Sequence, residues 1–588
     1  MIRRRIPVHI LAGTGAFALS VSLSPAAFAQ VAPRPDPLPG QLPPPETTTP
    51  ATPDGTTQPS RVSVDSRAAL EQRPCPFDGS DLRLTLNEVQ FTRIDGSPLP
   101  PEIAQALSGL AIPKGDQSVR SICEVRDAAN EALRRQGWIA SVQVPPQEIN
   151  TGTLRLNVVT AHIVETRVRG NAGPYEGVMR ARIAELEALD PLNERTAERI
   201  LLLAGDIPGL DIQLSLRPAG TGPGQVIGEL TINYRRFAIL GNAQNYNSKL
   251  LGRETGYLRA EFYGLTGMGD TTYIGASTTA DFHEQKILQV GHIAQLDQSG
   301  TTLGARFSYA WSRPDLDPLD YRTDTIIGGL DLIQPIKRSV NFNLRATGGF
   351  DYVDQYTEIG TGTGLLPLTT DKLRILYLGL SGDKRATRLD GSVAWSLRGG
   401  VEIRKGFNIL GATRPGFAGG QIQSRVDGEA DAFVARANLQ ATVGLGRFIN
   451  LVGEMQGQWA NAPLLNYEEF SLGNLTIGRG YDPGANSGDR AVGLRGEVQA
   501  NLPISSRVNT QVFGFYDYVK LVNLDPGSIE ANRQFRSVGG GLRLALPGKV
   551  LLEIAYAHPI DKALTIDKAP PPNRVLVSLS FRFRDGAR

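Results

Sequence analysis

Residues 235–588 carry a pattern that few folds satisfy, a long series of short segments in which apolar and polar residues alternate. We count sixteen such segments, recurring about every 22 residues, which suits a membrane strand of about 10 residues followed by a turn or loop. The clearest run from Phe433 to Leu445 and from Val492 to Leu502. Charged residues on the polar face of many segments favour a water-filled interior over a soluble sandwich. The sequence therefore predicts a transmembrane β-barrel of about 16 antiparallel strands.

The composition supports this fold and excludes others. No stretch after residue 30 approaches the roughly 18 consecutive apolar residues that a membrane-spanning helix needs. Glycine supplies 65 of the 588 residues, which suits a chain with many turns and strands. The 61 Lys and Arg nearly balance the 59 Asp and Glu, for a net charge of +2. This balance gives no reason to expect a nucleic-acid partner.

The N-terminal residues have the pattern of an exported protein. Residues 1–29 combine a basic start, a short apolar run and the sequence Ala27-Phe28-Ala29, which is typical of a secretory signal peptide. Residues 30–73 form a Pro/Thr-rich linker, because they lack the apolar periodicity that a packed core requires. A short helix from Val62 to Arg73 is the one regular element that the linker suggests.

The only two cysteines, Cys75 and Cys123, follow the linker. In an exported chain an isolated pair is most simply a disulfide. A redox-active pair is the alternative, but such pairs usually have Cys-x-x-Cys spacing, and these cysteines are 48 positions apart. We therefore predict a structural bridge.

Residues 74–161 and 162–234 repeat one α+β scheme. Apolar residues recur at strand or helix spacing in both units. The expected strands of the first unit cover residues 84–91, 138–144 and 154–159, and its helices cover 103–110 and 119–133. The expected strands of the second unit cover residues 163–168, 212–216 and 227–232, and its helices cover 175–186 and 194–203, the latter capped by Asn193.

Motifs in both units resemble the polypeptide-transport-associated (POTRA) domains of two-partner secretion transporters. Gly137-Trp138 with Pro145 and Gly152 resembles the first such domain, and Pro191-Leu192-Asn193 with Pro208-Gly209-Leu210 resembles the second. The two cysteines also lie where that family often carries a pair. The resemblance implies two POTRA domains, residues 74–161 and 162–234, before a barrel at 235–588. On these motifs alone, generic α+β domains remain the alternative.

A long loop between the eleventh and twelfth predicted strands, residues 463–489, is the candidate functional site. It contains Gly478-Arg479-Gly480-Tyr481, in which the two glycines let the backbone fold tightly and the guanidinium project. An arginine in a barrel loop needs a carboxylate partner, and Asp517 is the candidate. Since side chains alternate along a strand, Asp517 faces inward if Phe513 and Phe515 do.

These residues resemble the arginine-bearing loop and the Phe-x-Asp strand motif of the Omp85 superfamily. The resemblance implies that the loop folds back into the barrel and that Arg479 contacts Asp517. We call this contact the lock, and Gly480, Tyr481 and Phe515 belong to it. Gly478 stands where the family often has Val or Ile. The last segment, Val575–Phe583, resembles the C-terminal signal of outer-membrane barrels, although the chain continues five residues further. The alternative for Arg479 alone is a solvated loop arginine.

Enzyme functions have little support in the sequence. The five histidines lie in separate segments without metal-site spacing, and no nucleophile motif is present. A glycine-rich run at residues 360–364 is not followed by a helix, as a phosphate-binding loop requires. We expect no catalysis, cofactor, metal or nucleotide.

The resemblance as a whole implies a transporter of the haemolysin secretion/activation class. Its POTRA domains would lie in the periplasm and bind a secreted exoprotein in extended form, and its barrel would sit in the outer-membrane bilayer and pass the exoprotein. One alternative is an Omp85-type insertase that assembles outer-membrane proteins, but two POTRA domains, not three or more, argue against it. The other is a passive porin, which has no use for such domains.

Overall fold

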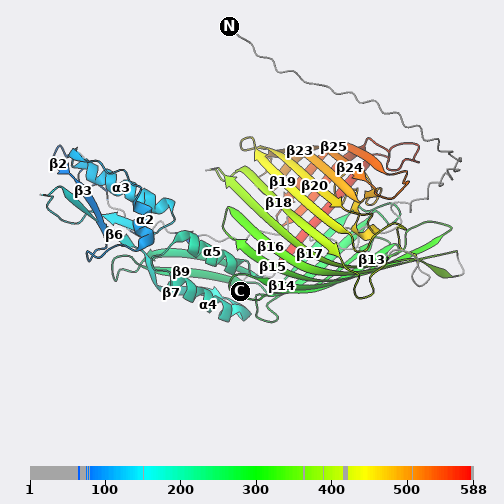
Figure 1. Cartoon of the computed structure of the whole chain (residues 1–588), viewed down its shortest axis with the longest axis horizontal. Coiled ribbons are helices and arrows are strands. Elements are labelled where there is room, and N and C mark those ends of the chain that lie inside the picture. The colour runs from blue at the N-terminus through cyan, green and yellow to red at the C-terminus, as the bar shows by residue number, and fades with distance from the viewer. Residues whose placement is uncertain are drawn as a thin grey trace, which may run out of the picture.

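A computed structural model describes residues 64–65, 70, 74–75, 77 and 80–584, except 150, 362–363, 389, 415–421, 506 and 548. Two α+β units lie one after the other at one end of a large β-barrel (Figure 1). We call this end of the barrel proximal and the opposite end distal. The chain enters the barrel from the second unit at the proximal end, so the first barrel strand, β10, runs toward the distal end. Each following strand of the barrel runs in the opposite direction to the one before it.

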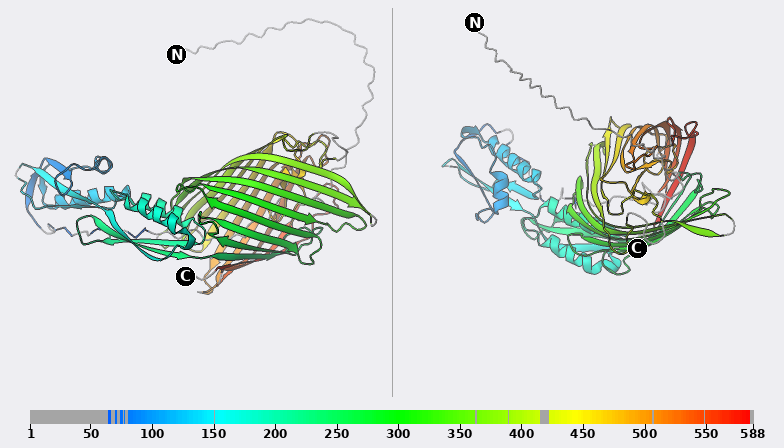
Figure 2. Two further views of the ribbon diagram at one scale, coloured as in Figure 1. Left: turned by 90° about the horizontal axis from the view of Figure 1, so that it is seen from below. Right: turned by 45° about the vertical axis from the view of Figure 1, so that its right-hand side comes forward.

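The barrel is closed by sixteen strands, as the sequence predicts. Each strand pairs antiparallel with its neighbours, and the first, β10, closes the ring against the last, β27. The left-hand view of Figure 2 shows the strong tilt of the strands. The sixteen strands are β10 (Phe237–Gln244), β11 (Thr255–Tyr263), β12 (Thr271–Thr279), β13 (Gln285–Gln295), β14 (Thr302–Ser312), β15 (Asp320–Lys337), β16 (Phe342–Gly360), β17 (Leu365–Thr387), β18 (Val393–Gly406), β19 (Phe433–Gly444), β20 (Ile449–Ala460), β23 (Arg490–Leu502), β24 (Asn509–Val522), β25 (Asn532–Leu546), β26 (Val550–Pro559) and β27 (Arg574–Arg584).

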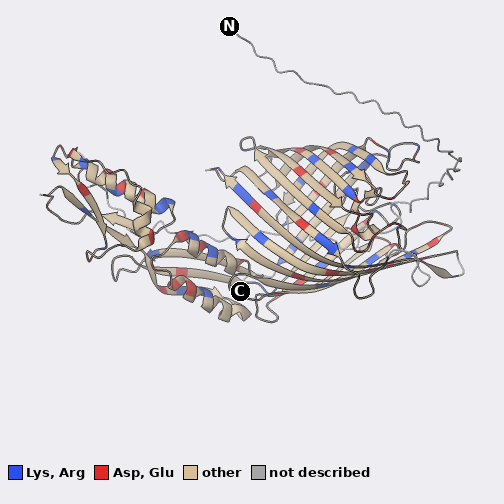
Figure 3. Cartoon of the chain, viewed as in Figure 1, with Lys and Arg blue, Asp and Glu red and all other residues tan. Residues whose placement is uncertain are grey.

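Alternation along the strands separates an apolar outer face from a polar inner face. In β24 the odd-numbered Phe513, Phe515 and Asp517 are buried inside, whereas Val512 and Tyr516 are exposed outside. Lys, Arg, Asp and Glu are spread along the strands of the barrel (Figure 3). Among the described residues, no helix is both long and apolar enough to cross a membrane.

The first α+β unit contains the elements that the sequence suggests, with one strand divided. Its elements are β2 (Arg83–Leu86), β3 (Glu88–Thr92), α2 (Pro101–Leu107), β4 (Gly115–Ser118), α3 (Arg120–Arg135), β5 (Ala140–Gln143) and β6 (Thr153–Thr160). The single strand expected over 84–91 is wrong, because the chain turns at Asn87, whose amide donates to the carbonyl of Gly152 at 2.7 Å. As a result β2 pairs with β4 and β3 pairs with β6, in separate sheets.

The second unit has a four-stranded sheet in the order β1-β8-β9-β7. Its elements are β1 (Val64–Asp65), β7 (His162–Asn171), η1 (Gly173–Tyr175), α4 (Glu176–Glu187), α5 (Glu194–Gly205), β8 (Leu210–Pro218) and β9 (Gln225–Tyr234). The predicted cap of α5 is present, since the Asn193 side chain accepts hydrogen bonds from the amides of Arg195 and Thr196 at 3.0 and 3.4 Å.

The predicted signal peptide at 1–29 and nearly all of the linker at 30–73 lie outside the described residues. The short helix expected from Val62 to Arg73 is wrong for two of its residues. Val64–Asp65 form β1 and pair in parallel with Leu214 and Ser215 of β8. Pairing with an existing sheet edge satisfies backbone groups that a helix of this length holds only marginally.

The second unit is bonded directly to the proximal turns of the barrel. The Tyr175 hydroxyl donates to the carbonyl of Asp270 at 3.0 Å, and the Tyr234 hydroxyl donates to that of Tyr263 at 2.7 Å. Arg338 donates two hydrogen bonds to Asp206, both 2.7 Å long. These contacts fix the unit beside the opening through which the chain enters the barrel.

Candidate functional site

The loop of residues 463–489 lies inside the distal half of the barrel, between β20 and β23. The right-hand view of Figure 2 looks into the ring of strands, with the yellow loop segments inside. The loop has some regular structure of its own, because η2 (Asn466–Glu468) starts it and β21 (Phe470–Ser471) pairs with β22 (Ser487–Gly488). Its apolar residues Leu472, Ile477 and Tyr481 are buried in one cluster with residues of the barrel wall. Packing against the wall therefore holds the loop in the barrel.

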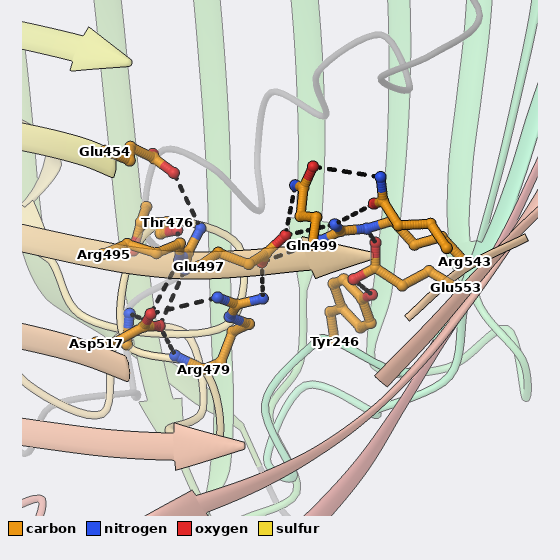
Figure 4. Close-up of polar contacts among 12 residues, drawn as sticks. Tyr246, Glu454, Thr476, Arg479, Arg495, Glu497, Gln499, Asp517, Arg543 and Glu553 are labelled. Atoms are coloured by element: carbon orange, nitrogen blue, oxygen red, sulfur yellow. Dashed lines mark hydrogen bonds and ion pairs between the residues drawn. The ribbon is translucent and has the colours of Figure 1, made fainter. Parts of the chain in front are cut away.

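Arg479 points from this loop to the barrel wall (Figure 4). Its guanidinium lies 3.0 Å from Glu497 Oε2 on β23 and 3.4 Å from Asp517 Oδ1 on β24. Its backbone amide donates to Asp517 Oδ2 at 2.9 Å. The residue is only 6% exposed, so the two carboxylates compensate a charge that is almost removed from water.

Asp517 is the centre of the polar network. It is fully buried and accepts hydrogen bonds from the amides of Gly478 and Arg479. It also accepts two from the Arg495 guanidinium, at 3.0 and 3.1 Å. One carboxylate thus binds two arginines, one from the loop and one from the neighbouring strand.

The ring of Phe515 stacks against the guanidinium of Arg479. The guanidinium carbon of Arg479 lies 3.4 Å from the centre of the Phe515 ring and 5.7 Å from that of Phe513. Both rings and Asp517 face the interior, as alternation along the strand predicts. A cation held over an aromatic ring in a desolvated site gains about 2 kcal/mol, which adds to the ion pairs.

Tyr481 and Gly480 complete the group of residues that the sequence places in the lock. The Tyr481 hydroxyl accepts from the amide of Asp561 at 3.0 Å and lies 2.9 Å from that residue's carbonyl oxygen. Its ring meets Phe535 edge-on, with centres 5.7 Å apart. Gly480 has a φ of +97°, and a Cβ there would lie 2.9 Å from Pro559 Cγ. Only glycine suits this position, where the loop backbone approaches β26 closely.

Sequence reasoning missed the second carboxylate of the network, Glu497. It binds Arg479 and Arg543, and its other neighbour Gln499 donates to it at 2.7 Å. Arg543 continues the network to Glu553 at 2.7 Å. The signal was available, because Arg495 and Glu497 lie on the polar face of a clearly alternating segment.

Solved structures share this fold. CdiB from Escherichia coli matches with a TM-score of 0.67 at 15% sequence identity, over 88% of this chain and 94% of that one. CdiB from Acinetobacter baumannii matches with a TM-score of 0.60 at 16% identity, over 92% of this chain and 95% of that one.

Sequence relatives point to one family. The heme/hemopexin transporter protein HuxB of Haemophilus influenzae is 22% identical over 502 residues, which cover 83% of this chain and 86% of HuxB. The family model described as haemolysin secretion/activation protein ShlB/FhaC/HecB matches residues 383–544, a range that includes Arg479 and Asp517. Together these similarities indicate a two-partner secretion transporter of the Omp85 superfamily.

This assignment places the barrel of the transporter in the outer membrane. The α+β units lie on the periplasmic side, so the distal end of the barrel faces the cell exterior. The relatives are transporters. The polar network joins the loop to β23 and β24.

The base of the loop is fastened by two further buried arginines. Arg425, from the segment between β18 and β19, lies 2.7 Å from Glu469 and 2.6 Å from Asp489. Arg404 on β18 lies 3.0 Å from Glu468. The loop of the transporter is therefore fixed at its base as well as at Arg479.

The predicted cysteine pair lies far from the loop. Cys75 and Cys123 are joined as a disulfide with their Cα atoms 5.8 Å apart. The bond ties the segment before β2 to helix α3 of the first unit. The bond lies outside the barrel and cross-links two parts of the first unit.

Proposed function

We propose that the transporter receives an exported exoprotein in extended form on two periplasmic POTRA domains, residues 74–161 and 162–234, and passes it through the barrel at residues 235–588. Residues 1–29 serve as the signal peptide and residues 30–73 as the linker. The carrying observation is the loop at 463–489, bound inside a closed barrel whose proximal end holds the second α+β unit. A purely passive pore needs neither feature.

In this proposal the Arg479 network is a lock that keeps the loop in a working position. Several charge-assisted hydrogen bonds join the loop to the wall strands β23 and β24. The roles of Arg479, Gly480, Tyr481, Phe515 and Asp517 in transport follow from this position. In this proposal an exoprotein segment passes beside the loop, and the network keeps the loop inside the barrel.

The edge of β7 is the surface on which we expect the exoprotein to add a strand. Within the described residues, β7 pairs with β9 only, so its other edge has unpaired backbone groups. Val164 and Val168 on this strand are 44% and 47% exposed. Backbone pairing gives affinity for any extended segment, and exposed apolar side chains add to it. The edge of β8 is partly covered by β1.

Site-specific photo-crosslinking tests this surface. A photoreactive residue at Val168 is expected to capture the exoprotein during export, whereas the same residue at Glu187, at the end of α4, is the matched control. Capture at Glu187 but not at Val168 would move the binding surface away from β7.

The function as a whole is tested by paired proteomes of culture supernatant and outer membrane, from a strain without the gene and the same strain complemented. We expect one large exoprotein to disappear from the supernatant and return on complementation. Broad depletion of outer-membrane barrels would instead show an insertase. No change in either fraction would favour a passive porin.

A further inference from the structure

The membrane-facing surface of the barrel has a groove near its distal end that the transport mechanism does not use. It has a volume of about 510 Å³ and lies across β18, β19, β20, β23 and β24. Most of a barrel's outer surface is filled by bulky apolar side chains. This groove therefore needs an explanation in the sequence of these five strands.

Strand register shows how the groove forms. Val401, Ala437, Gly457, Val492 and Lys520 lie directly opposite one another on the five strands, in that order. Ala437 and Gly457 are the smallest residues in the row, so the surface is hollow there. Val401 and Val492, which are 58% and 47% exposed, form the walls.

The next row toward the cell exterior repeats this arrangement. Ile403, Ala435 and Trp459 lie opposite one another, with a small residue again between two large ones. The guanidinium of Arg490 lies 5.2 Å from the Trp459 ring centre. The groove is thus apolar along its length and reaches a tryptophan and two cations, Arg490 and Lys520, at its outer end.

The charged residues on this face are all basic and all lie near the distal end of the barrel. The outward positions of these five strands carry no acidic residue, and their only charged residues are Lys405, Arg490 and Lys520, all close to the distal ends. Neither Arg490 nor Lys520 forms an ion pair with a carboxylate in the described part of the chain. Arg490 and Val522 are register partners, as are Val492 and Lys520. The two cations are therefore diagonal neighbours, about 7 Å apart at the backbone. Arg490 Nε donates to the carbonyl of Ala460 at 2.8 Å, which leaves the terminal nitrogens of Arg490 and the Lys520 ammonium as the donors for a phosphate group.

We propose that this groove binds a phosphorylated acyl lipid of the outer leaflet, with the chemistry of lipid A. The apolar hollow takes an acyl chain at the depth of the outer leaflet, and Arg490 with Lys520 takes the phosphate at the membrane surface. Arg is suited to phosphate because its donors form a fork, and Trp is suited to the interface between chain and headgroup. This inference is independent of the exoprotein and of the lock.

Native mass spectrometry of the purified full-length transporter in detergent tests the proposal. The probes are bisphosphorylated lipid A, the same lipid A after dephosphorylation, and phosphatidylethanolamine. The double variant Arg490→Gln, Lys520→Gln is expected to retain bisphosphorylated lipid A more weakly, by about fivefold for each cation removed. Gly457→Leu fills the hollow and leaves the cations; its Cβ would meet only ordinary contacts, the nearest 3.8 Å away. It is also expected to weaken retention.

Lys286→Gln is the matched control. Lys286 is likewise exposed on the outer face at the distal end of its strand, β13, and lies opposite Trp311, but it is not among the residues that line the groove. Heat-dependent gel mobility confirms that each variant is a folded barrel. The proposal is supported if the control binds like wild type while both groove variants lose lipid A. It is overturned if the groove variants bind like wild type, or if dephosphorylated lipid A or phosphatidylethanolamine binds equally well.

Discussion

Arg479 reaches Asp517 through both its backbone and its side chain, with the amide nitrogen 2.9 Å from Oδ2 and the guanidinium 3.4 Å from Oδ1. The backbone bond fixes where the loop lies, and it does not depend on the arginine side chain. The guanidinium adds the contacts to Glu497 and the Phe515 ring. A mutation of the Arg479 side chain therefore removes its charged contacts and leaves the backbone bond that positions the loop.

Replacing Asp517 is expected to destabilise the barrel interior. Asp517→Asn removes the charge that compensates Arg479 and Arg495 in a fully buried site, and breaking a buried pair costs about 3–5 kcal/mol. The measurement is the temperature at which the purified barrel loses its compact gel mobility. Glu454→Gln is the control, because Glu454 is less buried and, among the residues that the structure describes, forms an ion pair with Arg495 alone, at 3.2 Å. Equal unfolding temperatures for Asp517→Asn and wild type would contradict the network.

Two glycines with nearly the same backbone conformation isolate the close contact at Gly480. Gly480 and Gly446 have φ values of +97° and +96°, but a Cβ at Gly446 meets nothing within 4 Å. Alanine at either position pays the backbone cost of about 1–2 kcal/mol, and only Gly480→Ala adds a clash with Pro559. We expect faster protease cleavage within residues 463–489 in Gly480→Ala only. The same cleavage rate in both variants would show that the loop does not need this approach.

The junction between the second α+β unit and the barrel depends on Tyr175. Tyr175→Phe removes the hydrogen bond to the Asp270 carbonyl, worth about 1 kcal/mol, and is expected to widen the distance distribution between spin labels on the two parts. Burial raises the pKa of Tyr175 far above its ordinary value. The hydroxyl therefore stays protonated, and the wild-type junction should persist at about pH 11, beyond the usual tyrosine pKa of about 10. A junction that loosens near pH 10 would contradict this contact.

The disulfide is expected to stabilise the first α+β unit. Replacing both Cys75 and Cys123 by serine should lower the unit's stability by about 2–4 kcal/mol, because the bond restricts the unfolded chain. Hydrogen exchange in α3 of the full-length transporter measures the effect, with exchange in the barrel strands as the internal control. Two free thiols in the mature protein, counted by mass spectrometry, would remove the basis of the prediction.

Local patterns predicted most of the fold because period-two alternation is written into each strand. Sixteen strands and the inward face of Phe513, Phe515 and Asp517 followed from it. The division at Asn87 did not, since it depends on a hydrogen bond to Gly152, which is far away in the sequence. The pair Arg479–Asp517 came from a motif resemblance. The alternation places Glu497 on the polar face of its strand, but its approach to Arg479 depends on the register of β23 against β24, which no local pattern sets.

The charged groups at the base of the loop were also beyond local reasoning. Arg425 binds Glu469 and Asp489, which lie near the two ends of the loop, and Asp525, which follows β24. Each residue alone resembles an ordinary solvated loop charge. Only the closed barrel brings them together, because closure places distant loops around one opening.

The most direct test of the account is export by Arg479→Ala and Arg479→Lys, measured as secreted exoprotein per folded barrel in the outer membrane. Alanine keeps the backbone bond to Asp517 but loses the side-chain contacts, and lysine keeps the charge but loses the planar fork. We predict that both variants insert as folded barrels, that alanine abolishes export and that lysine restores only part of it. Wild-type export by Arg479→Ala would contradict the lock.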